Sequence, residues 1–184
     1  MTDGFILSNF GSHFFLCDYT DNTTIPASGK EVENVISYTP PELSKDTKSY
    51  KTLTNNGWVS IAVLGQSAGD ISMSFIRDAK GVYTGKNADT DSYTVLKTWF
   101  DSSLGASAGL NARKNFIAVK PRLTSEGEAA YEGTLYHVIP KNWSDGPSDP
   151  DNGQEFNITL AVFQAPIPVA VTATENSFTF AAVA

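Results

Sequence analysis

The 184-residue sequence has one cysteine, Cys17, and few histidines. A lone cysteine excludes an internal disulfide, so stability has to come from packing or from assembly. The sequence also lacks a run of roughly eighteen apolar residues, which excludes a transmembrane helix. The N-terminus carries Asp3, an acid where a secretory signal would have basic residues, and its apolar run is short. We therefore expect a chain that starts and folds in a cytoplasm.

Positive charge is also scarce, with 13 lysines and arginines against 20 aspartates and glutamates and a formal net charge of −7. A protein that grips nucleic acid needs a basic stripe to neutralise the phosphates. The charge balance excludes that class of binder. The same sign suits a surface past which nucleic acid slides without being held.

Residue sets for catalysis or zinc binding are missing as well. The G-x-S-x-G pattern around Ser67 follows a predicted strand, but the next segment again has the period of a strand, whereas an esterase needs a helix there. His137 lies inside a predicted strand, where a structural role is the simpler interpretation. His13 and Cys17 are too few for a zinc site. We predict no enzyme activity, no cofactor and no metal.

Calcium is the alternative that acidic stretches keep open. Residues 87–91 begin like an EF-hand loop, but Ser92 stands where glycine is needed and Thr98 where the bidentate glutamate belongs. Helix capping explains these acids more simply. A second acidic set is more simply a solvated turn. Its members are Asp145, Asp149, Asp151 and Glu155.

Period-two patterns dominate the rest of the sequence. Residues 70–76 and 155–163 alternate apolar and polar side chains, and residues 116–119 and 131–139 are typical of strands. One helix is predicted over residues 92–104. Strands joined by short polar turns build antiparallel sheets. We predict a single domain over residues 1–184 that is mainly β, an antiparallel β-sandwich or barrel with one flanking α-helix.

The segments between these elements are less regular. Residues 32–38 are predicted to start the sheet, and residues 58–64, apolar on nearly both faces, predict a central or covered strand. Residues 39–57, rich in Pro, Lys, Ser and Thr, predict a long loop, and loops of that length are usually functional or disordered. Residues 142–153 predict an exposed acidic loop. Residues 165–184 begin with a proline-containing break and predict a C-terminal arm or an added strand.

The order of these pieces resembles the major tail tube protein of long-tailed, siphophage-type bacteriophages. The resemblance covers roughly the second half of the chain and rests on no single motif. It lies in GDISMSFI (69–76), SYTVLKTWF (92–100), KNFIAVK (114–120), EAAYEGTLY (128–136) and QEFNITLAVF (154–163). It implies a β-sandwich with a flanking helix, six copies per ring, and rings stacked into a hollow tube. In such tubes the subunit sheets join into one barrel, and the bore conducts DNA during ejection.

The resemblance also implies where the protein acts and with what. It implies synthesis in the cytoplasm of a bacterial host and a final place in the virion tail. The implied partners are further copies of the chain, the tail terminator, and the baseplate and tape-measure proteins. DNA would pass through the lumen without specific binding, and no membrane is involved.

Two groups of residues are candidates for assembly. The polar sides of the strands are predicted to line an acidic or neutral lumen that repels the DNA backbone: Asp70, Ser72, Ser74, Glu132, Thr134, Glu155, Asn157 and Thr159. The loop over residues 39–57 is predicted to make contacts between rings, because long loops often carry partner surfaces. Its candidate residues are Pro40, Pro41, Leu43 and Tyr50. Residues 165–184 would serve that role equally.

A β-sandwich binding module is the main alternative. Carbohydrate-binding and adhesive domains display exposed aromatic side chains, and Trp143 beside the acidic loop is a candidate of that kind. Another tail or head-completion component is a further alternative, since a fold does not by itself specify a function.

Overall fold

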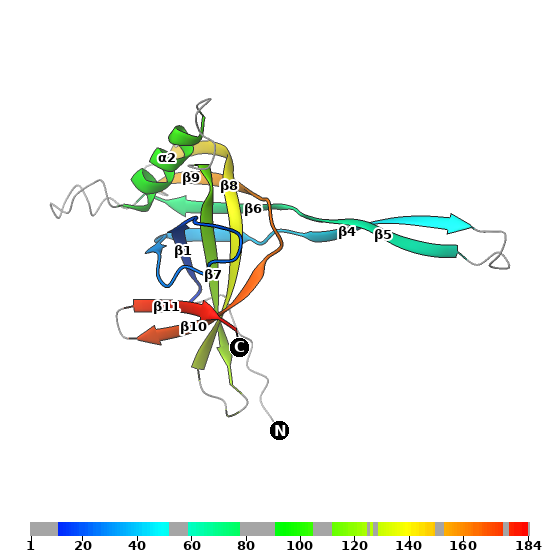
Figure 1. Ribbon diagram of the computed structural model, residues 1–184. Helices are drawn as coiled ribbons and strands as arrows, with labels where there is room; N and C mark the ends of the chain where they lie inside the picture. The colour runs from blue at the N-terminus through cyan, green and yellow to red at the C-terminus, as the bar shows by residue number, and fades with distance from the viewer. Residues whose placement is uncertain are drawn as a thin grey trace, which may run out of the picture.

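The computed structural model describes residues 11–51, 59–77, 91–104, 112–124, 126, 129–149, 153–174 and 177–183. Its strands are β1 (His13–Asp18), β2 (Lys30–Glu31), β3 (Val35–Thr39), β4 (Leu43–Lys51), β5 (Val59–Ala68), β6 (Asp70–Ile76), β7 (Lys114–Leu123), β8 (Ala129–Asp149), β9 (Gly153–Val162), β10 (Ile167–Thr174) and β11 (Ser177–Ala182). The helix α2 covers Ser92–Ser103. Figure 1 shows a compact body and a long hairpin that projects from it.

The body is one nine-stranded antiparallel sheet that rolls up on itself. Its order is β2-β1-β7-β8-β9-β6-β3, with β10 and β11 attached to β8. The segment that contains β2 and β3 closes the roll, because β2 pairs with β1 and β3 pairs with β6. The backbone N–H of Val32 donates to the Phe14 carbonyl at 2.7 Å. The rings of Phe14 and Tyr38 lie 4.8 Å apart, so β1 and β3 meet across the core.

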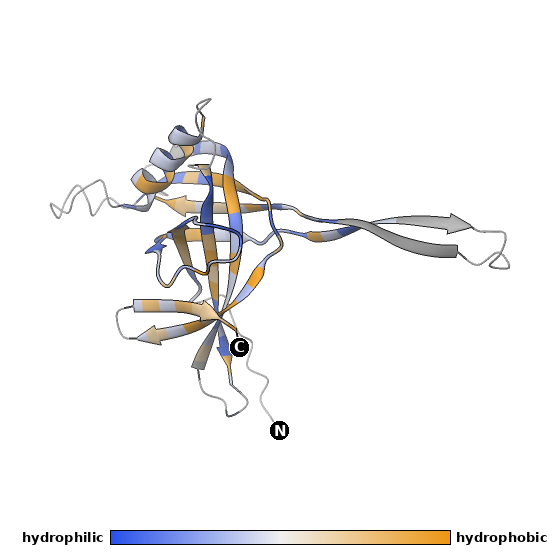
Figure 2. Cartoon of the chain, viewed as in Figure 1, coloured by the Kyte–Doolittle hydropathy of each residue, from blue (hydrophilic) through white to orange (hydrophobic). Residues whose placement is uncertain are grey.

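The main core lies inside this roll, and α2 covers part of it. Alternation in β6 and β9 is confirmed, because one side of each strand is at most 2% exposed: Ile71, Met73, Phe75, Phe156, Ile158 and Leu160. The predicted helix is also confirmed. Asp91 caps its N-terminus by accepting a hydrogen bond from the Thr94 N–H at 2.8 Å, and its Leu96 and Trp99 side chains are buried in the same core. Figure 2 shows the apolar residues gathered in the strands of the body.

A second core lies on the other face of β1, β7 and β8, under the C-terminal hairpin. β10 continues the direction of β9 along the same edge of β8, after the break at residues 163–166. The hairpin buries Val169 and Phe180 against Ile117 and Leu135. The segment predicted as an arm or an added strand is therefore an added pair of strands.

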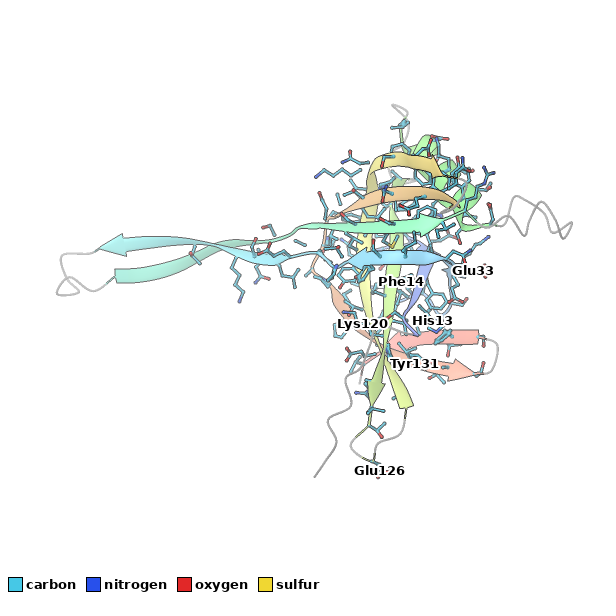
Figure 3. All side chains as sticks on the ribbon, turned by 180° about the vertical axis from the view of Figure 1, so that it is seen from behind. His13, Phe14, Glu33, Lys120, Glu126 and Tyr131 are labelled. Carbon is cyan, nitrogen blue, oxygen red and sulfur yellow. The ribbon has the colours of Figure 1, made fainter. Side chains whose placement is uncertain are left out.

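The prediction of a loop over residues 39–57 is wrong for its described part. Residues 43–51 form β4, which pairs with β5 in a separate two-stranded sheet. Since β3 also pairs with β6, the four strands β3, β4, β5 and β6 make one long pair of antiparallel segments, and its outer half, β4 with β5, projects as an arm (Figures 1 and 3). β5 is accordingly an arm strand and not a central strand, which is one of the two alternatives that residues 58–64 predict. An apolar run predicts a strand, but it does not predict which strands pair with that strand or whether it lies at the centre of a sheet.

The prediction of an acidic loop over residues 142–153 is also wrong. β8 runs on to Asp149, and β9 begins at Gly153. Trp143 pairs with Ile158 and packs against the main core, while Asn142 and Ser144 point to the other face. Two register shifts, between Pro140 and Asn142 and between Asp145 and Ser148, keep the ladder in step. The Asp, Pro and Gly residues therefore sit in a bulged strand.

The seam between β8 and β10 depends on Gly133. A Cβ atom at this position would lie 2.6 Å from the Val169 Cγ2 and 2.7 Å from the Val171 Cγ2. We expect Gly133→Ala to lower the free energy of unfolding by about 1–3 kcal/mol, the usual cost of overpacking. Urea denaturation measures the loss. Ala170→Ser, on the exposed face of β10, is the control and should change stability by less than about 0.5 kcal/mol. A Gly133→Ala variant as stable as this control would contradict the packing described.

Candidate assembly surfaces

The outer face of β3, β6, β9 and β8 carries two rows of small uncharged polar side chains. Each row crosses all four strands, because their residues are paired in register. The first row is Thr39, Ser72, Thr159 and Asn142, and the second is Ser37, Ser74, Asn157 and Ser144. We call these eight residues the polar rows. They form on the reverse of the core because the apolar partners of each strand point inward.

One side-chain hydrogen bond within the rows and one ion pair beside them stabilise this face. The Ser74 hydroxyl donates to the Asn157 Oδ1 at 2.5 Å. At one end of the rows, the Lys141 Nζ lies 2.5 Å from the Asp70 Oδ2. Glu155, opposite Ile76, carries a negative charge at the other end. The rows themselves hold no lysine or arginine, so the face is neutral at its centre and weakly charged at its ends.

The structure brings six of the eight predicted lumen residues together on this face. Asp70, Ser72 and Ser74 lie on β6, beside Glu155, Asn157 and Thr159 on β9.

Glu132 and Thr134 lie elsewhere. Thr134 pairs with Ala118, a residue of the main core, so both side chains leave the sheet on its opposite face. The register shift after Pro140 reverses the alternation along β8. Even-numbered residues such as Thr134 face the core side before the shift, and even-numbered residues such as Asn142 face the polar side after it. Glu132 and Thr134 therefore do not share a face with the other six candidates on β6 and β9.

Four members of the polar rows were not predicted. Asn142 and Ser144 belong to the segment taken for a loop, although the alternation of Asn142, Trp143, Ser144 and Asp145 was a usable signal. Ser37 and Thr39 flank Tyr38 in the same way on β3. Turn-forming composition around both segments hid these alternations.

The arm continues the strands that carry the polar rows. At its root, Pro40 is exposed, Pro41 is buried, and Leu43 is 62% exposed. Tyr50 lies in β4 opposite Ser60. A groove of about 580 Å³ runs between the root of the arm and the β9–β10 connection, with Leu43 on one wall and Pro166 on the other. Nine residues of β4 extend the arm by about 30 Å at roughly 3.3 Å per residue.

The esterase-like pattern has no matching architecture. Ser67 lies within β5, which runs on to Ala68 and is followed by the strand β6. Its hydroxyl makes a 2.7 Å hydrogen bond with the Ser44 hydroxyl across the arm. The strand-to-helix turn that activates an esterase serine is absent here.

His137 has a structural role in a buried polar pair. Its Nδ1 lies 2.7 Å from the Asn115 Oδ1, and the Asn115 side-chain N–H donates to the Asp18 carbonyl at 3.1 Å. The imidazole is fully buried between the rings of Tyr19 and Phe163. Burial lowers the pKa of His137, because the imidazolium would lose its hydration there, although Asp21 nearby acts in the opposite direction.

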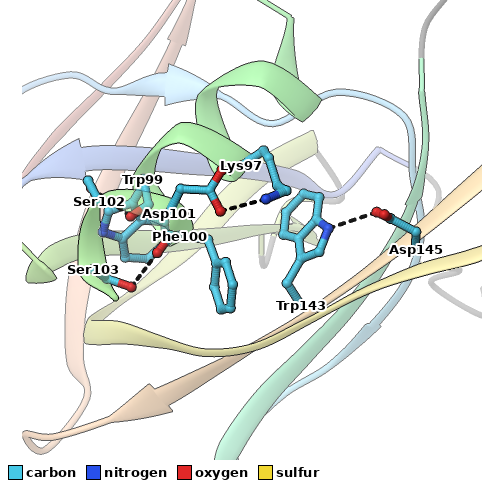
Figure 4. Close-up of polar contacts among 8 residues, drawn as sticks. All are labelled: Lys97, Trp99, Phe100, Asp101, Ser102, Ser103, Trp143 and Asp145. Carbon is cyan, nitrogen blue, oxygen red and sulfur yellow. Dashed lines mark hydrogen bonds and ion pairs between the residues drawn. The ribbon is translucent and has the colours of Figure 1, made fainter. Parts of the chain in front are cut away.

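The Trp143 ring packs under α2 (Figure 4). Tyr93 and Phe156 lie 5.6 and 6.0 Å from it. Its indole N–H donates to the Asp145 Oδ1 at 2.8 Å, and the Lys97 Nζ lies 5.9 Å from the ring. Lys97 also pairs with Asp101 at 2.5 Å. The ring is partly buried, packs against the main core and contacts side chains of the helix, so it does not form the freely exposed platform on which the carbohydrate-binding alternative depends.

Among the residues that the structure describes, no three His, Cys, Asp or Glu side chains are grouped so that they could hold a metal ion. Among the described helical residues, none form a helix long and apolar enough to cross a bilayer.

Comparison with solved structures places the fold in a recognisable class. The chain is similar to one from the sheath–tube complex of the extracellular contractile injection system PVC in its extended state (TM-score 0.57, 15% identity, 91% of this chain and 93% of the other). It is also similar to the tube-terminating cap of the anti-feeding prophage (0.55, 14%, 89% and 91%) and to the PVC sheath/tube terminator (0.54, 14%, 84% and 91%). Neither a protein-family model nor a curated protein matches the sequence.

The chain therefore has a tail tube-like fold. The predicted fold class, mainly β with antiparallel sheets and one helix, is confirmed. At these identities the likeness concerns the fold alone.

The buried histidine predicts a stability that depends on pH. Because its folded-state pKa lies below the ordinary value of about 6.5, the unfolded chain takes up a proton before the native protein does as the pH falls. The stability present above pH 6.5 is lost below it, with a slope of up to about 1.4 kcal/mol per pH unit for one proton.

Denaturant titrations from pH 7.5 to 5 measure this slope. In His137→Gln, the part of the pH slope of the unfolding free energy that His137 contributes should be lost. His13→Gln, at the only other histidine in the sequence, should keep it. If both variants keep the wild-type slope, His137 is not the group that titrates.

Proposed function

We propose that the protein is a tail tube subunit, which assembles into stacked hexameric rings and forms the channel for DNA ejection. It is a structural component of the virion tail and has no enzymatic role. The polar rows carry this proposal. A face of hydroxyl and amide groups, built on the back of a fully buried core, is suited to a water-filled bore.

The charge of this face fits the passage of DNA. Phosphates bind where lysines and arginines replace their counterions, and the polar rows offer none. Asp70 is paired with Lys141, and Glu155 adds a negative charge at one end. DNA moving along the polar rows meets hydrogen-bonding groups that water also satisfies, and the Lys141 cation at one end of the rows is already paired with Asp70. Binding is therefore non-specific and weak.

The arm supports the stacking of rings. Its strands β4 and β5 extend β3 and β6, so it points along the direction of strands that carry the polar rows (Figure 1). If those strands line the bore, the arm reaches toward the next ring. The apolar Leu43 is exposed at its root, and Pro40 and Pro41 set the joint. The arm takes over the inter-ring role predicted for a loop at these residues.

The implied partners follow from a tube. They are further copies of the chain, the tail terminator, and the baseplate and tape-measure proteins. The siphophage-type tail suggested by the sequence resemblance stays a prediction, and a tail without a sheath around the tube would support it. A tube terminator is the second candidate, because a tube-terminating cap and a sheath/tube terminator share the fold.

Assembly of the purified protein tests the proposal. We expect negative-stain electron microscopy across a concentration series to show hollow rings or tubes with sixfold symmetry, and mass photometry to show a species of six subunits. Single rings that never stack at any concentration would favour the terminator. A protein that stays monomeric throughout would contradict both functions.

Shortening the arm separates stacking from ring formation. Residues 47–64 are replaced by Asn-Gly, a tight hairpin turn that closes the remaining pair of Asp46 and Gly65. We expect rings of normal diameter without tubes. The melting temperature of the monomer should stay within a few degrees, since β4 and β5 form a sheet separate from the cores. Tubes of normal length would show that the arm does not join rings.

A further inference from the structure

Within the described residues, the four neighbouring strands that carry the polar rows present two edges without a strand partner. β3 is the last strand of the sheet order, and its described partner is β6, on one side. At the other end, pairing between β7 and β8 stops at Lys114 and Val138. Residues 139–149 of β8 therefore have β9 on one side and, within the described part of the chain, no strand on the other. Unpaired edges are normally covered, because their N–H and C=O groups bind other strands.

We propose that β3 of one copy pairs with residues 139–149 of β8 in the next copy. The inference rests on the proposed function and names the two strands that form each seam. A contact between two different edges is heterologous, and it gives a ring if the rotation closes.

Strand direction agrees with this pairing. Each neighbouring pair in the series β3, β6, β9 and β8 is antiparallel. β3 and β8 therefore run in opposite directions. When copies are related by rotation about an axis along the strands, β3 meets the neighbouring β8 in the antiparallel sense. Every junction around the ring then has the same geometry as the pairs inside one subunit.

The faces also agree. Ser37 and Thr39 on β3, and Asn142 and Ser144 on β8, point to the same side of the sheet. Rotation keeps that side facing the axis, so the polar rows continue from copy to copy. The apolar faces of neighbouring copies then also lie on one common side, because successive side chains on a strand point to opposite faces of the sheet.

The unpaired edge of β3 has room and an apolar side chain for a partner. A groove of about 510 Å³ separates β3 from β1 and β7, with Phe14 and Lys120 on its far side. Ile36, at the register shift of β3, is 50% exposed beside it. An added strand would cover Ile36 and fill the groove.

Cysteine cross-linking tests the seam. The variant carries Ser37→Cys and Ser144→Cys, and it is treated with a thiol cross-linker of about 10 Å. Diagonal neighbours on adjacent strands lie at about 7–8 Å, so this length tolerates a register offset of one or two residues. The natural Cys17 does not compete, since it is buried and its pKa is raised to about 12. We expect a ladder on denaturing gels from dimer up to hexamer.

Three controls define the result. The single variants Ser37→Cys and Ser144→Cys should give no ladder, and a dimer from Ser37→Cys alone would show that β3 pairs with another β3 and overturn the proposal. Ser72→Cys with Thr159→Cys, neighbours within one copy, should cross-link inside the monomer.

Electron microscopy of the same samples separates the two claims. Rings without a ladder would overturn the β3–β8 seam and leave the tube function standing. The absence of both rings and ladder would overturn both.

Discussion

Burial of one face of β6, β9 and β8 is the constraint on which the other features depend. Phe75, Phe156 and Ile158 are almost completely removed from water, and a residue buried to that extent fixes the face of each neighbour on its strand. A slip of one residue would expose the whole apolar set. The burial of the apolar side chains therefore also fixes the register of the polar rows on the opposite face. The surface proposed for the bore needs little stabilisation of its own beyond local hydrogen bonds and one ion pair.

The polar face, the arm and the main core share strands of the same backbone. β3 and β6 provide two strands of the polar face, and β4 and β5, which continue them, provide the described part of the arm. The joint lies at the prolines before β4 and at Gly69, whose N–H donates to the Glu42 carbonyl at 2.7 Å. A stress on the arm is thus transmitted to strands that are anchored in the core. α2 closes the opposite side of that core through Leu96, Trp99 and the Trp143 ring, so it lies on the far side of the sheet from the polar rows.

Alternation and capping made the well-packed elements predictable. The strands around Met73 and Ile158 and the helix capped by Asp91 appear where the sequence places them, because burial of one face imposes a period on the residues. The composition of the arm and of the end of β8 predicts loops, because Pro, Gly, Ser and Asp are typical of turns. In β8 the register shifts accommodate these residues within a strand. In the arm, β4 and β5 pair with each other in a separate two-stranded sheet, and pairing between backbones by itself imposes no apolar period on the sequence.

The sequence by itself determined a mainly antiparallel fold, the helix over Ser92–Ser103 and, with a single cysteine, the lack of an internal disulfide, since composition and local period suffice for each of these. It also determined which sides of β6 and β9 are polar. Only the tertiary structure decided which polar sides share a face. Glu132 and Thr134 were separated from the others, and Asn142 and Ser144 joined them, because strand order and register shifts depend on contacts between residues far apart in the chain. The projecting arm and the two unpaired edges are likewise properties of pairing between strands, which a local pattern does not encode.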